Sequence, residues 1–213
     1  MNGIQMFESS QLSTKEVLEM GDVILALSGP RACGKSTIAK HLVQNHGYTR
    51  FAFADALREI AKCAGDDFID DRDYLARLGT TLREMLPRFL LDVISQKIAR
   101  IEGPVVIEDI RFPTEFDFCK SIGAITIRFE IPREEQLKRL LSRDGVFGPD
   151  AEHLLDCMDE NLLTDISDWD RNYVAEGDFQ QLAATMAKDM KQSCWESDYM
   201  LHKHPKDDSG VMA

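Results

Sequence analysis

The sequence lacks the features that mark membrane proteins, zinc proteins and disulfide-stabilised proteins. No apolar run approaches the roughly 18 residues that a membrane-spanning helix needs. The N-terminal segment carries charged residues such as Glu8 and Lys15 and has no long apolar run, so we expect no signal peptide. The five cysteines, at positions 33, 63, 119, 157 and 194, form no C-x-x-C pair and no Cys/His ligand spacing. We therefore expect a protein of a reducing cytoplasm.

An excess of positive charge is also missing. The chain has 25 Lys and Arg against 37 Asp and Glu, a net charge of −12 and a pI near 4.8. Phosphate backbones attract proteins with positive surfaces, so a general nucleic-acid binder is disfavoured. Local basic clusters that face an anionic substrate remain compatible with this charge.

The pattern that is present is that of an α/β protein. Short apolar segments alternate with longer amphipathic ones, which predicts a parallel sheet covered by helices, and 44% hydrophobic residues suffice for a core. The expected strands are Val23–Leu27, Arg50–Ala54, Val105–Ile107, Ala124–Ile131 and Asn172–Val174. The expected helices are Thr37–Asn45, Ala56–Cys63, Leu75–Ile101, Thr114–Ser121, Glu134–Ser142, Ala151–Leu163 and Phe179–Ser193. Pro87 is expected to break the long third helix.

The length of 213 residues predicts one domain, which we place at residues 1–201. Ser13–Glu16 resembles a capping box that opens a short helix before the first strand. At the other end, His202–Ala213 is polar and lacks a core pattern, so we expect a flexible tail.

The strongest motif is a phosphate-binding loop. The residues Gly29-Pro-Arg-Ala-Cys-Gly-Lys-Ser36 match G-x-x-x-x-G-K-[ST] between an expected strand and an expected helix. Its glycines let backbone N–H groups surround phosphate oxygens, and the helix N-terminus adds partial positive charge. ATP is the expected cofactor, held by Gly29, Arg31, Ala32, Cys33, Gly34, Lys35, Ser36 and Thr37. Lys35 is expected to reach the β- and γ-phosphates, and the Ser36 hydroxyl to hold Mg²⁺.

A second element is the apolar strand that ends in Glu108 and Asp109. A carboxylate at this place steers magnesium through its waters in proteins with such a loop. Asp109 is our first choice for this acid and Glu108 the alternative.

Three further segments follow in order: Phe53-Ala-Asp-Ala-Leu-Arg58, Leu78-Gly-Thr-Thr-Leu-Arg-Glu84 and Asp109-Ile-Arg-Phe-Pro-Thr-Glu115. Together with the loop, this series resembles the bacteriophage deoxynucleoside monophosphate kinases. Dephospho-coenzyme A kinases and animal-type phosphomevalonate kinases are more distant relatives. The likeness runs from about Val23 to Met190.

The resemblance implies a five-stranded parallel sheet flanked by helices, with a helical acceptor-binding insert near residues 55–101 and a lid near residues 133–160. It puts Asp55, Arg58 and Arg83 beside the acceptor, and Asp109 and Arg111 below the phosphates. A nucleotide-like acceptor is then the expected partner, with DNA only as a possible substrate and no membrane.

The lid-like segment contains Arg139 and Arg143, four residues apart on one helix face. Phosphoryl transfer needs cations around the moving charge, so the candidate catalytic residues are Lys35, Asp55, Arg111, Arg139 and Arg143. His153-Leu-Leu-Asp156 loosely matches the family's His-x-Ser-Glu and departs from it at Leu155 and Asp156.

Asp55 separates the possible functions. It is expected to end the second strand, where a carboxylate could act as base for a hydroxyl acceptor. It could instead balance an arginine or cap the following helix. We expect a deoxynucleotide acceptor in phage nucleotide metabolism or DNA modification. The alternatives are a hydroxyl-acceptor kinase, such as a phage 5-hydroxymethyluridine DNA kinase or dephospho-coenzyme A kinase, and a nucleotide-dependent switch.

Overall fold

The computed structural model describes residues 23–145, 148–155 and 162–190. Its centre is a five-stranded sheet in the order β2-β3-β1-β4-β5, in which every strand pair is parallel. The strands are β1 (Ile24–Ser28), β2 (Thr49–Ala52), β3 (Val105–Glu108), β4 (Ile125–Glu130) and β5 (Arg171–Val174). The predicted α/β fold with a five-stranded parallel sheet is therefore confirmed.

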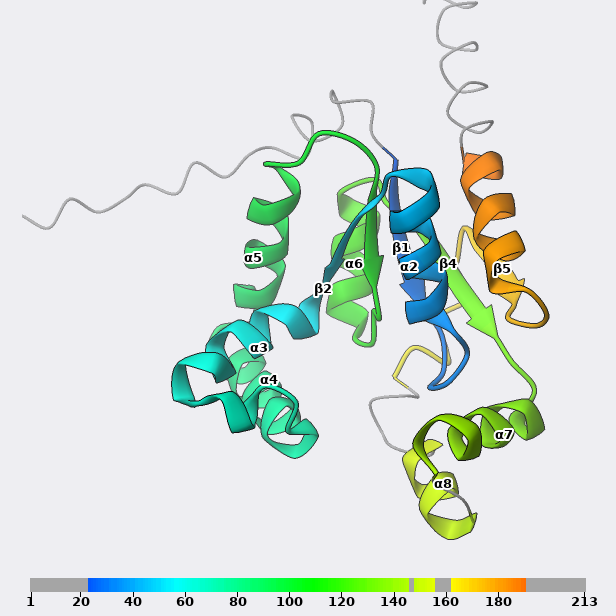
Figure 1. Ribbon diagram of the computed structural model, residues 1–213. Coiled ribbons are helices and arrows are strands. Elements are labelled where there is room, and N and C mark those ends of the chain that lie inside the picture. The colour runs from blue at the N-terminus through cyan, green and yellow to red at the C-terminus, as the bar shows by residue number, and fades with distance from the viewer. Residues whose placement is uncertain (1–22, 146–147, 156–161, 191–213) are drawn as a thin grey trace, which may run out of the picture.

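Helices cover both faces of this sheet (Figure 1). One face packs against α2 (Lys35–His46) and against the helical residues 179–190. The other packs against α5 (Phe89–Ile98) and α6 (Pro113–Ser121). Because β1 is buried on both sides, all five of its residues are buried, which explains its continuous apolar sequence.

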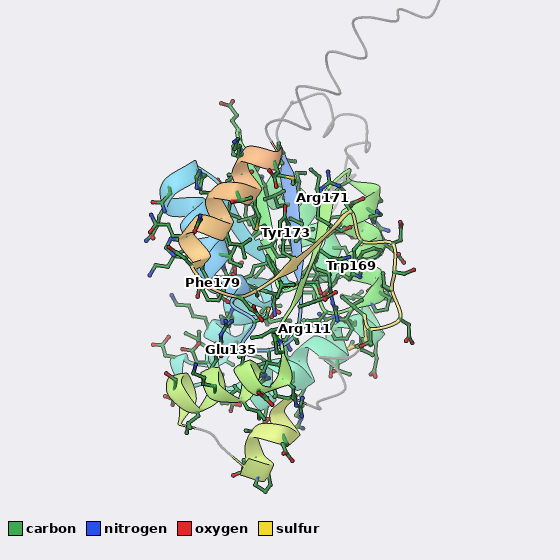
Figure 2. All side chains as sticks on the ribbon, turned by 90° about the vertical axis from the view of Figure 1, so that its right-hand side faces the viewer. Arg111, Glu135, Trp169, Arg171, Tyr173 and Phe179 are labelled. Atoms are coloured by element: carbon green, nitrogen blue, oxygen red, sulfur yellow. The ribbon has the colours of Figure 1, made fainter. Side chains whose placement is uncertain are left out.

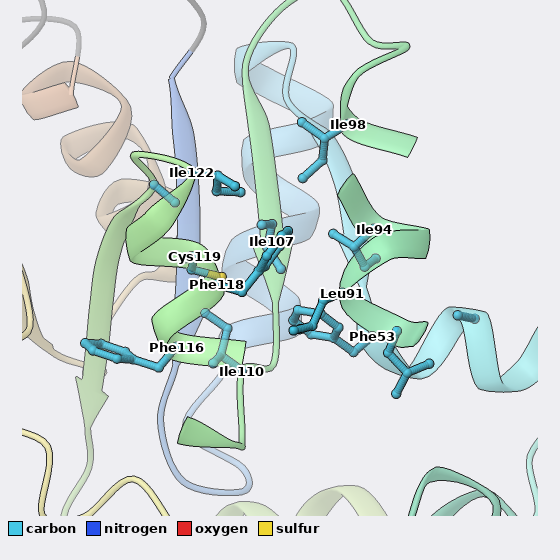
Figure 3. Packing of buried hydrophobic residues seen from close by; sticks show 14 of the residues in the cluster. Phe53, Leu91, Ile94, Ile98, Ile107, Ile110, Phe116, Phe118, Cys119 and Ile122 are labelled. Carbon is cyan, nitrogen blue, oxygen red and sulfur yellow. The ribbon is translucent and has the colours of Figure 1, made fainter. Parts of the chain in front are cut away.

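The larger apolar cluster fills the space between the sheet, α5 and α6 (Figure 3). Ile107 on β3 lies at its centre, between Phe118 of α6 and Ile94 of α5. The cluster continues along α3 (Phe53–Ala64), whose buried residues Phe53, Ala56, Leu57 and Ala61 recur at helical spacing. This packing anchors the helices that follow β2 to the main body.

Two helical segments extend from the carboxyl end of the sheet (Figure 1). The first contains α3, the short helix η1 (Asp66–Phe68) and α4 (Arg72–Met85). The second contains α7 (Arg133–Asp144) and α8 (Gly148–Leu155). The first segment covers only part of the predicted acceptor insert at residues 55–101, since α5 packs on the sheet, and the second falls within the predicted lid at residues 133–160. Their roles as insert and lid stay predictions. None of the helices in the described part of the chain is long and apolar enough to cross a membrane.

Some predicted boundaries need correction. The second strand ends at Ala52 rather than Ala54, because Phe53 already belongs to an amphipathic helix whose apolar face packs in the core. The break at Pro87 is confirmed, since α4 ends at Met85 and α5 begins at Phe89. The helix predicted at Ala151–Leu163 ends at Leu155 as far as it is described, and residues 162–165 form turns. The predicted Ser13–Glu16 helix and the tail lie outside the described residues.

Candidate active site

The phosphate-binding loop connects β1 to α2. Gly34 has φ 100° and precedes the helix without any side-chain cap, so the first N–H groups of α2 stay available to a ligand. A Cβ atom on Gly34 would lie 2.5 Å from the Phe179 ring, and one on Gly29 would lie 2.8 Å from the Phe129 carbonyl oxygen. Both glycines are therefore required by contacts as well as by backbone conformation. This loop geometry suits an anion.

Lys35 is buried, and its ammonium group lies inside the loop. Nζ donates to the carbonyl oxygens of Gly29 (2.5 Å) and Pro30 (3.1 Å) and lies 3.5 Å from Asp109 Oδ1. Cys33 is also buried and places Sγ 3.8 Å from the same nitrogen, while Thr37 is exposed at the start of α2. Lys35 thus carries its charge to the place where the loop would hold phosphate oxygens.

A chain of polar contacts leads from the loop to α3. The Ser36 hydroxyl donates to Glu108 Oε1, and Glu108 Oε2 accepts from Arg50 Nε. The same guanidinium donates through Nη1 to Asp55 Oδ2 at 2.8 Å. Sequence reasoning missed Arg50, because only the pairing of β2 beside β3 brings it to Glu108.

Asp109 occupies a different place from Glu108. Its backbone has φ 63°, in the left-handed region, and its carboxylate contacts Lys35 and, at 2.9 Å, Arg111 Nε. Burial acts to raise the pKa of Asp109, but Lys35 and Arg111 outweigh it and hold this pKa below its usual value. Glu108, the predicted alternative, is the acid that contacts Ser36, and the preference for Asp109 as the magnesium acid stays a prediction.

Asp55 neither ends a strand nor caps a helix, contrary to both expectations. It lies in the first turn of α3, whose N-cap is Ala52. Its carboxylate is shared between two arginines, with Arg50 at 2.8 Å and Arg58 at 3.0 Å. Arg58 also reaches Asp70, at 3.9 Å. The Asp55 charge is thus balanced on both sides.

Arg83 projects from α4 toward the N-terminus of α6. Its Nη2 atom lies 2.7 Å from Glu115 Oε1, and its guanidinium lies 3.9 Å from the centroid of the Phe112 ring. Glu115 is 2% exposed and accepts the backbone N–H groups of Arg111 (3.0 Å) and Phe112 (3.2 Å). Burial raises the pKa of Glu115 despite these donors and Arg83.

Glu115 was missed as a site residue, although the sequence contains a signal. It stands three positions after Phe112, with Pro113 between, which is the spacing of an acid that caps a helix N-terminus. The segment from Asp109 to Glu115 is therefore held as one unit, with Arg111 at its centre.

Arg139 contacts backbone carbonyl oxygens of the phosphate-binding loop. It donates to the carbonyl oxygens of Ala32 (3.4 Å), Cys33 (3.2 Å) and Ala175 (2.9 Å). Figure 2 labels Glu135, which accepts from Arg139 Nε at 2.9 Å, and Phe179, whose ring centroid lies 4.9 Å from the guanidinium.

A second residue of α7 supports the loop in the same way. Gln136 donates to the Arg31 carbonyl oxygen at 2.7 Å, and sequence reasoning did not single it out. Helix α7 therefore holds the loop in place. Arg143 lies on the same helix, but its side chain, like those of His153 and Asp156, is outside the described part.

Comparison with known proteins places this site in a family. Residues 28–153, more than half of the chain, match the family model described as an AAA domain. The chain belongs to this family. The matched span contains the phosphate-binding loop, the helical segment after β2 and α7.

Two relatives are similar to part of this chain. A candidate deoxynucleotide monophosphate kinase of Acanthamoeba polyphaga mimivirus is 27% identical over 148 residues, covering 52% of this chain and 75% of the relative. A cytidylate kinase of Chlorobaculum tepidum is 29% identical over 145 residues, covering 63% of this chain and 60% of the relative.

The solved structures share the fold. A gluconokinase from Sinorhizobium meliloti has a TM-score of 0.55 at 17% identity, covering 85% of this chain and 98% of that one. A shikimate kinase from Acinetobacter baumannii, solved with shikimate, has a TM-score of 0.55 at 18% identity, covering 84% and 98%. The chain is a P-loop phosphotransferase.

Proposed function

We propose that this protein transfers the γ-phosphate of ATP to the phosphate group of a deoxynucleoside monophosphate. The observation that carries this proposal is the environment of Asp55, whose carboxylate is paired with Arg50 and Arg58. A general base takes the proton of the hydroxyl, whereas each oxygen of Asp55 already accepts a hydrogen bond from a guanidinium group. A carboxylate engaged by two guanidinium groups instead orients cations, which suits an anionic acceptor.

The residues of the loop fit ATP. Uncapped N–H groups at the start of α2, the left-handed backbone at Gly34 and the buried ammonium of Lys35 are donors matched to phosphate oxygens. Lys35 now donates to loop carbonyls, and these bonds are the ones that phosphate oxygens would replace. Bound ATP supplies the phosphoryl group that is transferred.

The Ser36 hydroxyl and the Glu108 carboxylate fit Mg²⁺, a cation that prefers oxygen ligands. In the described ranges no group of three or more His, Cys, Asp or Glu could hold a metal ion. A magnesium ion that shares its ligands among one hydroxyl, water and phosphate oxygens does not need such a group. We assign Ser36 as the direct ligand and Glu108 as the acid that acts through water.

Arg111 and Lys35 would then supply positive charge on either side of the transferred group. Both contact Asp109, which fixes them relative to each other. Cations held in place before the reaction stabilise the redistributed charge without reorganisation. A phage context follows from the sequence resemblance alone and is part of the proposal.

The experiment is a transfer assay with γ-labelled ATP. It compares the four deoxynucleoside monophosphates, their ribose counterparts, DNA that contains 5-hydroxymethyluridine, and dephospho-coenzyme A. We expect labelled deoxynucleoside diphosphate in the wild type and none in Lys35→Ala. Label in the modified DNA or in coenzyme A, with none in the nucleotides, would contradict the proposal and favour a hydroxyl acceptor. ATP turnover independent of every acceptor would favour a switch.

A further inference from the structure

Arg128 places a guanidinium at the carboxyl edge of the sheet. It pairs in register with Ser28, the last residue of β1 before the loop. Residues paired in this way face the same side of a parallel sheet. Ser28 Oγ donates to the Ile110 carbonyl oxygen at 2.9 Å, so this side is the one that carries Asp109–Arg111. Helix α2 packs on the other side.

The guanidinium of Arg128 contacts the ring of Trp169. The Arg128 guanidinium lies 5.6 Å from the centroid of Trp169, close enough for a cation–π contact. Trp169 is fixed in turn, because its indole N–H donates to the Ile166 carbonyl oxygen at 2.8 Å and its ring packs edge-on against Phe116 at 4.7 Å. Figure 2 shows Trp169 and Arg111 on the same side of the molecule.

Arg128 differs from the other arginines of the site in its lack of an acidic partner. Arg50, Arg83 and Arg111 each form an ion pair with a carboxylate. Within the described residues, no hydrogen bond and no ion pair joins Arg128 to any acceptor. Burial lowers the pKa of Arg128, and neither Cys33 nor Glu130 offsets this effect. The half-buried guanidinium of Arg128 therefore has donors that an anion could take up in place of water.

We propose that Arg128, held by Trp169, binds the phosphate group of the acceptor. This inference rests on the proposed function and adds a residue that neither the loop motif nor the Asp109–Glu115 segment contains. The planar fork of arginine matches two phosphate oxygens at once. Arg128 faces the side of Arg111 and not that of α2, which favours the acceptor over ATP as the ligand.

The first test is steady-state kinetics with a deoxynucleoside monophosphate and ATP. Arg128→Leu should raise the half-saturating acceptor concentration by about tenfold or more, the usual effect of losing a charge-assisted bond, and change that of ATP less than about twofold. Arg128→Lys should recover part of the loss, since it keeps the charge without the fork. Arg171→Leu is the matched control, because Arg171 is exposed and pairs with Ile127, which faces the other side. Equal changes in the half-saturating concentrations of ATP and of the acceptor would overturn the proposal.

The second test does not need turnover. In a Trp195→Phe background, Trp169 is the remaining tryptophan of the two in the chain and reports on its neighbour. With a non-hydrolysable ATP analogue and magnesium kept saturating, inorganic phosphate should change Trp169 fluorescence with a midpoint that Arg128→Leu shifts at least about tenfold. If Arg128→Leu does not fold, Arg128→Lys should shift the midpoint in the same direction by a smaller factor. An unchanged midpoint would refute the phosphate subsite. Failure of every acceptor in the transfer assay, with this shift intact, would instead refute only the proposed function.

Discussion

Arg83 and Glu115 form an ion pair, 2.7 Å long, that joins helix α4 to the turn containing Arg111. The carboxylate oxygen not used by Arg83 accepts the backbone N–H groups of Arg111 and Phe112. Arg83 is therefore already engaged, and we propose that it holds Glu115 and so positions Arg111. This carboxylate thus connects helix α4 to the turn that contains Arg111.

Glu115→Gln should lower kcat more than it raises the acceptor KM, because a neutral amide holds the Arg111 turn less firmly. We expect kcat to decrease by about tenfold, the usual effect of losing one charge-assisted contact. The matched control is Asp117→Asn, which neutralises an exposed acid on the same helix. A normal kcat in Glu115→Gln would show that Glu115 does not position Arg111 for catalysis.

Stability provides an independent check on Glu115. Its pKa in the folded state is raised above the ordinary 4.5, so the folded protein binds more protons than the unfolded chain just above that pH. The contribution of this group to stability therefore falls as pH rises above 4.5. Urea unfolding should show the stability of the wild type declining relative to that of Glu115→Gln as the pH rises above 4.5. The opposite slope would contradict the raised pKa.

Local sequence was sufficient to predict the loop and the sheet. Gly29–Ser36 folds as its motif indicates, and strands buried on both faces have continuous apolar sequences that are easily recognised. The different partners of Glu108 and Asp109 could not be predicted in this way. Glu108 contacts Ser36, whereas Asp109, with its left-handed backbone, contacts Lys35.

The contacts of Asp55 and Arg139 were unpredictable for a related reason. Asp55 meets Arg50 because α3 follows β2 directly and begins at Phe53 rather than at the expected Ala56. Arg139 meets loop carbonyls through contacts across more than a hundred residues of sequence. Helical spacing places a side chain on a face but does not identify what covers that face.

Magnesium dependence should distinguish the two acids at the end of β3. Glu108→Gln is expected to raise the magnesium concentration needed for half-maximal activity by about tenfold, because Glu108 contacts Ser36, the expected direct ligand. Asp109→Asn should leave this concentration nearly unchanged and lower kcat, since Asp109 contacts Lys35 and Arg111 instead. Magnesium titrations at saturating ATP measure both. The reverse pattern would restore Asp109 as the magnesium acid.

Arg139→Lys tests whether α7 supports the loop. Lysine cannot reproduce three separate donations to carbonyl oxygens, so the loop should loosen and the KM for ATP should rise by about five- to tenfold. Lys138→Ala is the control, because Lys138 is the exposed neighbour on the same helix. A fall in kcat with an unchanged KM for ATP would show instead that Arg139 leaves the loop and acts on the transferred group.

The acceptor class can be decided with Asp55 and Arg58. In a phosphate-acceptor enzyme, Asp55→Asn keeps an oxygen that can accept from Arg50 and Arg58, so kcat/KM should fall less than about tenfold. In a hydroxyl-acceptor enzyme the same change removes the base and should cost about a hundred- to ten-thousandfold. For Arg58→Ala the loss of kcat/KM should be large in a phosphate-acceptor enzyme and small in a hydroxyl-acceptor enzyme. The change removes a cation that an anionic acceptor needs and an uncharged hydroxymethyl group does not.

Asp70→Asn controls for charge near Arg58, because Asp70 is 93% exposed and 3.9 Å from that guanidinium. We expect a small loss of kcat/KM in Asp55→Asn and a large loss in Arg58→Ala, measured with the best nucleotide of the transfer assay. A loss of kcat/KM of about a hundredfold or more in Asp55→Asn, with a near-normal value in Arg58→Ala, would assign Asp55 as a base. The acceptor would then be a hydroxyl group and not the phosphate of a deoxynucleotide.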